Sequence, residues 1–396
     1  MSQVPSKVAR AGLAGVVGLA VVVGAAQLAG HHRAAPDTQA ASSDGTILQN
    51  GFGHLHLAPA VSYSNLTVYP VYGDGPAPAR PVTAEYMTLA EGMDKGSLTA
   101  READAGSVDG DGAAPAGTVG LSVPDESVTN ATQGQEHRDA NMILVTNTAP
   151  QPTYVPDGQV VPGGGQDRGA AADTIVPARS AQVGVAAFCV ERHRSHGPSA
   201  DFRKNVAIAI PSVRYAMQVT GEQQPVWNSV GVATRRFGAT TPTGTYAALI
   251  QNRAANTAVL PYTDALTVPI QAATPGRVVG VVAAINGRIV CTDLYKNPAL
   301  FNQMWPSLLR SYALQAAMQP TTRKPASADA EAVRTWVASL DSAPGTTSRQ
   351  SDLTRVARVT LPGGAGIRTA AVSGTGDNRI ALLHEAFWTP AAQMTN

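Results

Sequence analysis

Three consecutive glycines stand beside polar and charged side chains in the segment PGGGQDR, which runs from Pro162 to Arg168. Successive glycine amides can form a nest that binds an anion, and a guanidinium can bind phosphate or carboxylate through two parallel hydrogen bonds. The segment lacks the Lys-Ser/Thr ending of a phosphate-binding P-loop. The candidate ligand-binding residues are Gly163, Gly164, Gly165, Gln166, Asp167 and Arg168. The alternative is a tight structural loop whose Asp-Arg pair ties it to a sheet.

A second polar group follows a strand pattern in CVERHRSH, from Cys189 to His196. We interpret Glu191 as a buried carboxylate that orients Arg168 or a ligand. Three alternatives remain: Cys189 as a nucleophile with His193 as its base, a metal site of Glu191, His193 and His196, and a solvated loop. No HExxH-type signature supports the metal site, so no metal is predicted.

Two further residues complete the predicted binding set. Thr243 lies in PTGTY, which we expect to open a helix whose amino terminus is a second candidate anion site. Arg310 stands among apolar neighbours, and we expect it to pair with Asp293 or Glu191 or to contact a ligand anion. No cofactor can be assigned.

We interpret His54 and His56 as surface residues and the acidic segment 104–112 as a solvated loop.

The elements that must position these residues are strands followed by helices. Strand patterns occur in LTVYPVY, NMILVTNTA and AQVGVAAFCV, and TLAEGMDKG is a short helix with capping-box spacing between Thr88 and Glu91. Two apolar runs flank Asn286-Gly287, the pattern of a type I′ hairpin. Helices are predicted for QQPVWNSVGVATRRFG, for the segment after Asn297, which Pro306 must kink or split, and for a segment with Val333, Trp336, Val337 and Leu340 on one face. The fold class is α+β, an antiparallel sheet-rich single domain with helices segregated toward the carboxy-terminal half.

The charge balance argues against a nucleic-acid partner, and the amino terminus indicates an exported protein. Lys plus Arg (29) nearly balances Asp plus Glu (28), so the basic footprint of a nucleic-acid partner is absent. The segment 11–30 is almost entirely apolar and follows two cations, the layout of a signal peptide or a membrane anchor. We predict such a segment at 1–30, a flexible linker at 31–60, one domain at 61–396 and an extracytoplasmic location. Cys189 and Cys291 could pair there as a disulfide, or remain buried thiols.

Four stretches together resemble one family, the ARG-and-rhodanese-phosphatase-superfamily-associated domain, in which ARG stands for ADP-ribosylglycohydrolase. They are GGGQDR (163–168), AFCVERHR (187–194), PTGTY (242–246) preceded by QQPVW, and AINGRIVCTDLYKNPALFNQMWPSLLRSYAL (284–314). The resemblance covers roughly Asn65 to Trp388. Gly165 stands where the family has a basic residue, which removes one cation from the candidate site.

The resemblance implies a link to ADP-ribose and phosphate esters through genomic association, without an established activity. We therefore expect an exported domain that binds a small anionic ligand, phosphate-like or ADP-ribose-like. One alternative is an enzyme that processes phosphorylated or ADP-ribosylated nucleotide derivatives. The other is a structural cell-envelope protein without a ligand site. Motif sets of common hydrolases, dehydrogenases and kinases are absent from the sequence, and the oligomeric state is not predicted.

Overall fold

The computed structural model describes residues 52, 54–74, 85–103, 142–194, 197–204, 206–273, 276–319, 328–340, 345–351, 353–372 and 380–394. All of them belong to one compact unit, Thr46–Asn396. The predicted leader at 1–30 and the acidic segment 104–112 lie outside the described residues. Within the described part of the chain, no helix is long and apolar enough to cross a membrane.

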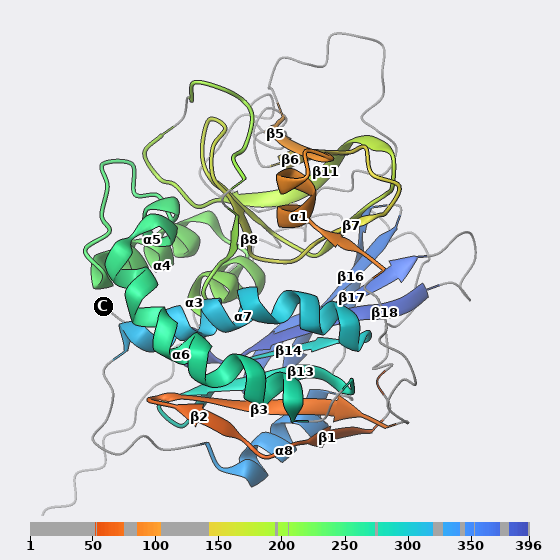
Figure 1. Cartoon of the computed structure of the whole chain (residues 1–396), viewed down its shortest axis with the longest axis vertical. Coiled ribbons are helices and arrows are strands. Elements are labelled where there is room, and N and C mark those ends of the chain that lie inside the picture. Colours follow the sequence, from red (N-terminus) through yellow and green to blue (C-terminus); the bar gives the residue numbers. More distant parts are fainter. Residues whose placement is uncertain are drawn as a thin grey trace, which may run out of the picture. The chain divides into compact units, whose positions relative to one another are not determined.

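An antiparallel nine-stranded sheet combines strands from both ends of the described chain (Figure 1). Its order is β1-β3-β13-β14-β18-β17-β16-β15, and β2 also pairs with β3. The bounds are Leu55–Leu57 (β1), Val61–Tyr63 (β2), Leu66–Gly73 (β3), Val278–Ile285 (β13), Arg288–Tyr295 (β14), Gly345–Ser351 (β15), Thr354–Leu361 (β16), Gly364–Val372 (β17) and Ile380–Trp388 (β18). The carboxy-terminal strands therefore join the main sheet, and β1 lies inside the range predicted as linker.

Two smaller sheets carry the glycine-rich segment and its neighbours. One has the order β12-β8-β9-β11-β6-β5 and is antiparallel, and the other has the order β10-β7-β4 with a parallel β4–β7 pair. The bounds are Met87–Thr88 (β4), Leu98–Glu102 (β5), Met142–Asn147 (β6), Thr153–Val155 (β7), Gln159–Val161 (β8), Arg168–Ala170 (β9), Thr174–Val176 (β10), Ser180–Cys189 (β11) and Ala207–Ile208 (β12). Because β7 to β10 are short and follow one another closely, their connecting turns bring polar residues together.

Apart from the short helix α1 (Leu89–Asp94), the described helices follow Pro211. They are α3 (Pro211–Tyr215), which continues into a π-helical turn η1 (Ala216–Thr220), α4 (Gln223–Arg236), α5 (Ala247–Gln251), α6 (Arg253–Ala272), α7 (Pro298–Met318), α8 (Ala330–Leu340) and a final 3-10 turn η3 (Pro390–Ala392). Helices α6 and α7 pack side by side, and both contact β3 (Figure 1). This arrangement confirms the α+β class.

The central strand β13 is buried at every position because helices cover both faces of the large sheet. Val281 and Ala283 pack into the cluster that contains α6 and α7. Val282 and Ala284 pack into a second cluster that contains α8. Successive side chains of a strand point to opposite faces, so α7 and α8 lie on opposite sides of β13.

Several local predictions are confirmed. Thr88 and Glu91 form the predicted capping box of α1, and the turn between β13 and β14 has positive φ values at Asn286 (51°) and Gly287 (77°). The sequence predicted that Pro306 would kink this helix or split it in two. The split is wrong, because α7 continues through Pro306. Burial of the helix on both sides of the proline outweighs the loss of one backbone hydrogen bond.

Candidate functional site

The loop Gly163–Arg168 joins β8 to β9, and protein oxygens already bind its amides. Gly163 and Gly164 have φ values of 122° and 58°, which side chains with a Cβ rarely adopt. Three successive amides donate hydrogen bonds: Gly163 to Asp167 Oδ1 (2.7 Å), Gly164 to the Asp201 carbonyl (3.2 Å) and Gly165 to Glu102 Oε2 (2.5 Å). These are the donors that an anion-binding nest would use.

Arg168 is buried at the end of the loop, with 3% of its surface exposed. Its guanidinium forms an ion pair with Glu102, donates to Gln166 Oε1 at 3.2 Å and contacts Cys189 Sγ. Burial raises the pKa of the Cys189 thiol, and the guanidinium offsets this only in part. The thiol is therefore protonated at neutral pH, and a nucleophile would require the thiolate.

Glu191, just after β11, binds the same loop from another side. Its Oε2 accepts hydrogen bonds from the Asp167 amide (3.1 Å) and from Arg194 Nε (2.8 Å). Burial raises the pKa of Glu191, but the hydrogen bonds from Arg194, Thr243 and the Asp167 amide outweigh burial and hold the pKa below its usual value. Glu191 is a buried carboxylate, and its charged partner is Arg194 instead of Arg168.

The turn that contains Thr243 reaches this cluster as well. The Thr243 carbonyl accepts the amides of Arg192 and His193 at 3.0 Å each, and Thr245 Oγ1 donates to Asp167 Oδ2. Burial raises the pKa of Asp167, and the bonds from Thr245 and the Gly163 amide lower it by less. The structure thus brings together the glycine loop, Glu191 and Thr243, which we call the loop cluster.

Two alternatives for this region can be placed on the structure. Helix α5 begins at Ala247 and has five residues, so Thr243 precedes the helix that PTGTY was expected to open. Of the alternative metal set, His193 is exposed and His196 lies outside the described residues. The metal alternative therefore falls partly outside the described residues and stays untested.

Arg310 belongs to a different region, a pocket of about 460 Å³. Its guanidinium donates to Asn256 Oδ1, so it does not make the predicted pair with Asp293 or Glu191. The pocket is lined by residues 206–208 in and before β12, by the end of α5, the start of α6 and the middle of α7: Val206, Ala207, Ile208, Ile250, Gln251, Asn256, Ser307 and Arg310. Among these residues Gln251 and Ser307 are exposed, and Ile208 and Ile250 are buried.

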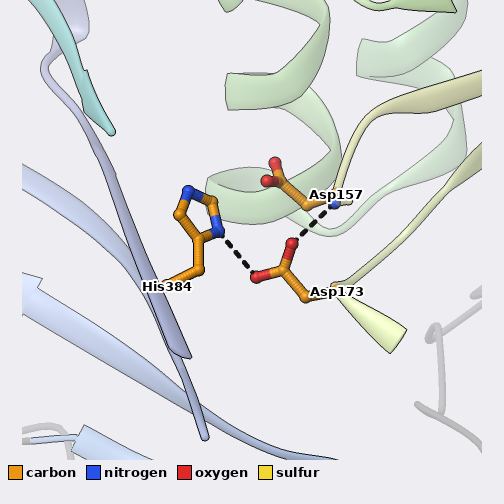
Figure 2. A group of neighbouring side chains, drawn as sticks. All are labelled: Asp157, Asp173 and His384. Atoms are coloured by element: carbon orange, nitrogen blue, oxygen red, sulfur yellow. Dashed lines mark hydrogen bonds and ion pairs between the residues drawn. The ribbon is translucent and has the colours of Figure 1, made fainter. Parts of the chain in front are cut away.

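A buried charged network connects the turns around β8 to the large sheet. Figure 2 shows Asp157, Asp173 and His384 with the side chain of Asp173 at the centre. Asp173 Oδ2 accepts from His384 Nδ1 (2.8 Å) and from Thr369 Oγ1 (2.6 Å). Its Oδ1 accepts from the Asp157 amide (2.9 Å) and from Tyr154 (2.7 Å). All the acceptor positions expected of one carboxylate are therefore occupied.

Arg214 extends this network from α3. It holds both oxygens of Asp157 (2.9 Å each) and both oxygens of Asp293 (3.1 and 2.6 Å). His384 Nε2 lies 3.3 Å from Asp293 Oδ1. Burial lowers the pKa of His384, but the adjacent Asp173 and Asp293 carboxylates outweigh it and raise the pKa to about 10. The imidazole is therefore charged at neutral pH.

Distances alone make Asp157, Asp173 and His384 a candidate metal centre, because one ligand atom from each lies within 4.8 Å of the others. Their hydrogen bonds argue against it. Asp157 is held by a guanidinium, Asp173 accepts four hydrogen bonds, and both nitrogens of His384 face carboxylates. A metal would need lone pairs that these groups already use. The residues therefore fit a hydrogen-bonded ion network.

The two cysteines do not form the disulfide considered from the sequence. Cys189 ends β11 in the six-stranded sheet, and Cys291 lies in β14 of the nine-stranded sheet. Burial raises the pKa of Cys291 well above its usual value. Both behave as buried thiols, which was the stated alternative.

Sequence reasoning did not select most of the buried network. A signal was present, because Arg214, Asp293 and His384 each interrupt an apolar run in IAIPSVRYAM, RIVCTDLY and ALLHEAFW. A charge inside a buried segment requires a partner. Asp157 and Asp173 stand in short polar turns, and nothing in their local sequence distinguishes them from surface carboxylates.

The sequence profile of the ARG and Rhodanese-Phosphatase-superfamily-associated Protein domain matches residues 54–380. The match includes the three sheets except for β18, of which it reaches only the first residue, and it includes the loop cluster and the Arg310 pocket. The chain belongs to this family, as its four motifs indicated. No curated protein and no solved structure matches the chain.

Proposed function

We propose that this protein is an exported domain that binds a small anionic ligand, and that the pocket at Arg310 holds the anion. The observation that carries the proposal is the state of this guanidinium. It is partly buried in a pocket wall, and its hydrogen-bond partner is the neutral amide of Asn256. Its positive charge is therefore not neutralised by that partner, and a guanidinium is well suited to carboxylate or phosphate.

The contrast with Arg168 supports this choice of site. Arg168 faces the carboxylate of Glu102, and the glycine amides beside it bind protein oxygens. An anion at the loop would have to displace Glu102 and then lie beside Asp167 and Glu191. An anion at Arg310 displaces no carboxylate, because no acidic side chain lines the described wall of that pocket. Binding at the glycine loop stays a prediction that the same experiment tests.

The size of the pocket agrees with a small ligand. Ligand pockets in proteins usually measure about 300–1,000 Å³, and this pocket, at about 460 Å³, lies in the lower part of that range. Four of its lining residues are aliphatic and four are polar or charged, so the pocket is more polar than most ligand sites.

A thermal-shift screen of the purified protein against phosphate, ADP-ribose, nucleotides and short carboxylates tests the proposal. A ligand that binds only the native state raises the melting temperature by mass action. The shift should disappear in Arg310→Gln and persist in Arg334→Gln, a matched control on the exposed face of α8. Loss of the shift in Arg168→Met but not in Arg310→Gln would place the anion in the loop cluster and refute the assignment to Arg310.

A second candidate is an enzyme acting on phosphorylated or ADP-ribosylated derivatives. One observation favours it: Asp167 and Glu191 are adjacent carboxylates whose pKa values burial and hydrogen bonds move in opposite directions. Such a pair is suited to one proton donor and one base. Release of ADP-ribose or phosphate from a test ester, abolished in Asp167→Asn, would support this candidate, and unchanged release in that variant would refute it.

A further inference from the structure

The charged groups around the Arg310 pocket restrict the chemistry of its ligand, if the proposed anion site is correct. Among the described residues that line the pocket, Arg310 is the one that is charged, and its partner Asn256 is neutral. A carboxylate carries one negative charge, whereas a phosphate monoester carries nearly two at neutral pH. The second charge would lack a partner in a partly desolvated site. The pocket therefore favours a carboxylate over a phosphate.

The same wall disfavours a cationic group on the ligand. No acidic side chain lines the described part of the pocket, so an ammonium group would lie near the Arg310 guanidinium without a counter-charge. A free amino acid carries such a group on the carbon that bears its carboxylate. The expected ligand is therefore a carboxylate without an amine.

The surface that the pocket offers to the rest of the ligand is more polar than apolar. Its aliphatic residues contribute little, because Ile208 and Ile250 are only 4% and 8% exposed. Among its polar residues, Gln251 and Ser307 are exposed and Arg310 is partly buried. A hydrocarbon chain would cover little apolar surface here, whereas a group that forms hydrogen bonds would find partners.

The two exposed polar residues can each donate and accept a hydrogen bond. The Gln251 amide and the Ser307 hydroxyl therefore match a ligand hydroxyl, which also does both. Ser307 and Arg310 are three positions apart on α7, so their Cβ atoms lie about 5–6 Å apart on one face of the helix. The Asn256 amide has another task, because it accepts from Arg310 and donates to the Ile250 carbonyl at 3.2 Å. A hydroxyl close to the carboxylate is the ligand group best placed to reach Ser307.

We infer that the ligand of this pocket is a hydroxy carboxylate, a single carboxylate on a short body that bears hydroxyl groups. The carboxylate binds Arg310, and the hydroxyl groups bind Ser307 and Gln251. Glycerate and the open-chain sugar acid gluconate have this chemistry. Inorganic phosphate, ADP-ribose, amino acids and plain aliphatic acids either lack hydroxyl groups or carry a charge that the pocket does not compensate.

Isothermal titration of the full-length protein with matched pairs of probes tests the inference. Glycerate against propionate, and gluconate against hexanoate, compare a hydroxylated acid with a plain acid of the same carbon number. Each hydroxylated acid should bind at least about fivefold more tightly than its plain partner, the factor that one ordinary hydrogen bond contributes. Glycerate should also bind more tightly than serine, which has an ammonium in place of one hydroxyl, and gluconate more tightly than neutral sorbitol.

Variants of the pocket separate its charge from its hydrogen-bonding groups. Arg310→Gln should remove the preference for gluconate over sorbitol, and Arg334→Gln, in an exposed pair on α8, should leave it unchanged. Ser307→Ala combined with Gln251→Ala should reduce glycerate binding to the level of propionate and leave propionate binding unchanged. Both of these residues are exposed, so the double variant should keep the buried core intact.

The outcomes distinguish this inference from the proposed function. Equal binding of hydroxylated and plain acids, or tighter binding of serine, inorganic phosphate or ADP-ribose than of glycerate and gluconate, would overturn the hydroxy-carboxylate ligand. If that binding is lost in Arg310→Gln, the anion site itself stands. If no anionic probe binds, or if anion binding survives Arg310→Gln, the anion site at Arg310 is refuted.

Discussion

The buried imidazole of His384 makes stability depend on pH in a direction that can be predicted. Burial lowers its pKa, and Asp173 and Asp293 raise it to about 10, from 6.5 for an ordinary histidine. The folded protein therefore retains a proton that the unfolded chain releases above pH 6.5. Stability from this proton is complete below the unfolded pKa and is lost as the pH rises toward the folded value.

The magnitude follows from the two pKa values. Each unit of difference corresponds to about 1.4 kcal/mol, so the full contribution is about 5 kcal/mol. Roughly 2 kcal/mol of it should be lost between pH 6.5 and about pH 8.5. Asp293, whose pKa is held far below its usual range, stabilises the fold above the ordinary aspartate pKa and contributes no slope in this window. The buried tyrosines and thiols have raised pKa values, and they add to the loss only at higher pH.

Urea denaturation at several pH values measures this loss. His384→Gln should be less stable than the native protein at pH 6.5 and should show a flatter pH profile up to about pH 8.5. If the variant does not fold, NMR of ring-labelled native protein provides a direct test, because the His384 ring should stay doubly protonated through pH 8.5. A neutral ring at pH 8, or a native stability curve without a slope in this window, would refute the reasoning.

Three further predictions concern other parts of the fold. Glu102→Gln leaves Arg168 buried without its counter-charge and should lower the unfolding free energy in urea by about 3 kcal/mol, whereas Glu331→Gln, in an exposed pair on α8, should cause no measurable loss. Alkylation of the denatured, unreduced protein followed by mass spectrometry should label both cysteines, and a missing pair of labels would show the disulfide that the structure lacks. Gly280→Ala should destabilise by more than about 2 kcal/mol, because its Cβ would lie 2.1 Å from the Asp293 carbonyl, and a folded variant of native stability would contradict the close approach of β13 and β14.

Local chemistry in the sequence predicted the elements better than it predicted their contacts. The hairpin at Asn286 and the capping box at Thr88 depend on neighbouring residues, and both are present. The loop cluster was predicted in part, because its members are polar groups at the ends of strands. The pairing of Glu102 with Arg168 spans 66 positions, and no periodic pattern marks a contact of that kind.

The prolines show the same limit. Helix α6 contains Pro261 and Pro269, and α7 contains Pro306. Local propensity predicts an interruption at such positions. The two helices continue because each is packed against the other and against β3, and this long-range packing is not visible in the residues around each proline.

The described arginines differ in whether a carboxylate already compensates their charge. Arg168, Arg194 and Arg214 each lie against carboxylates, so each is already compensated. A ligand anion would bind weakly to such an arginine, because it would have to displace the carboxylate that is already paired with it. Arg310 has a neutral partner and lies in a pocket wall. In our proposal, recognition therefore depends on a cation more than a hundred residues after the glycine-rich segment that first suggested an anion site.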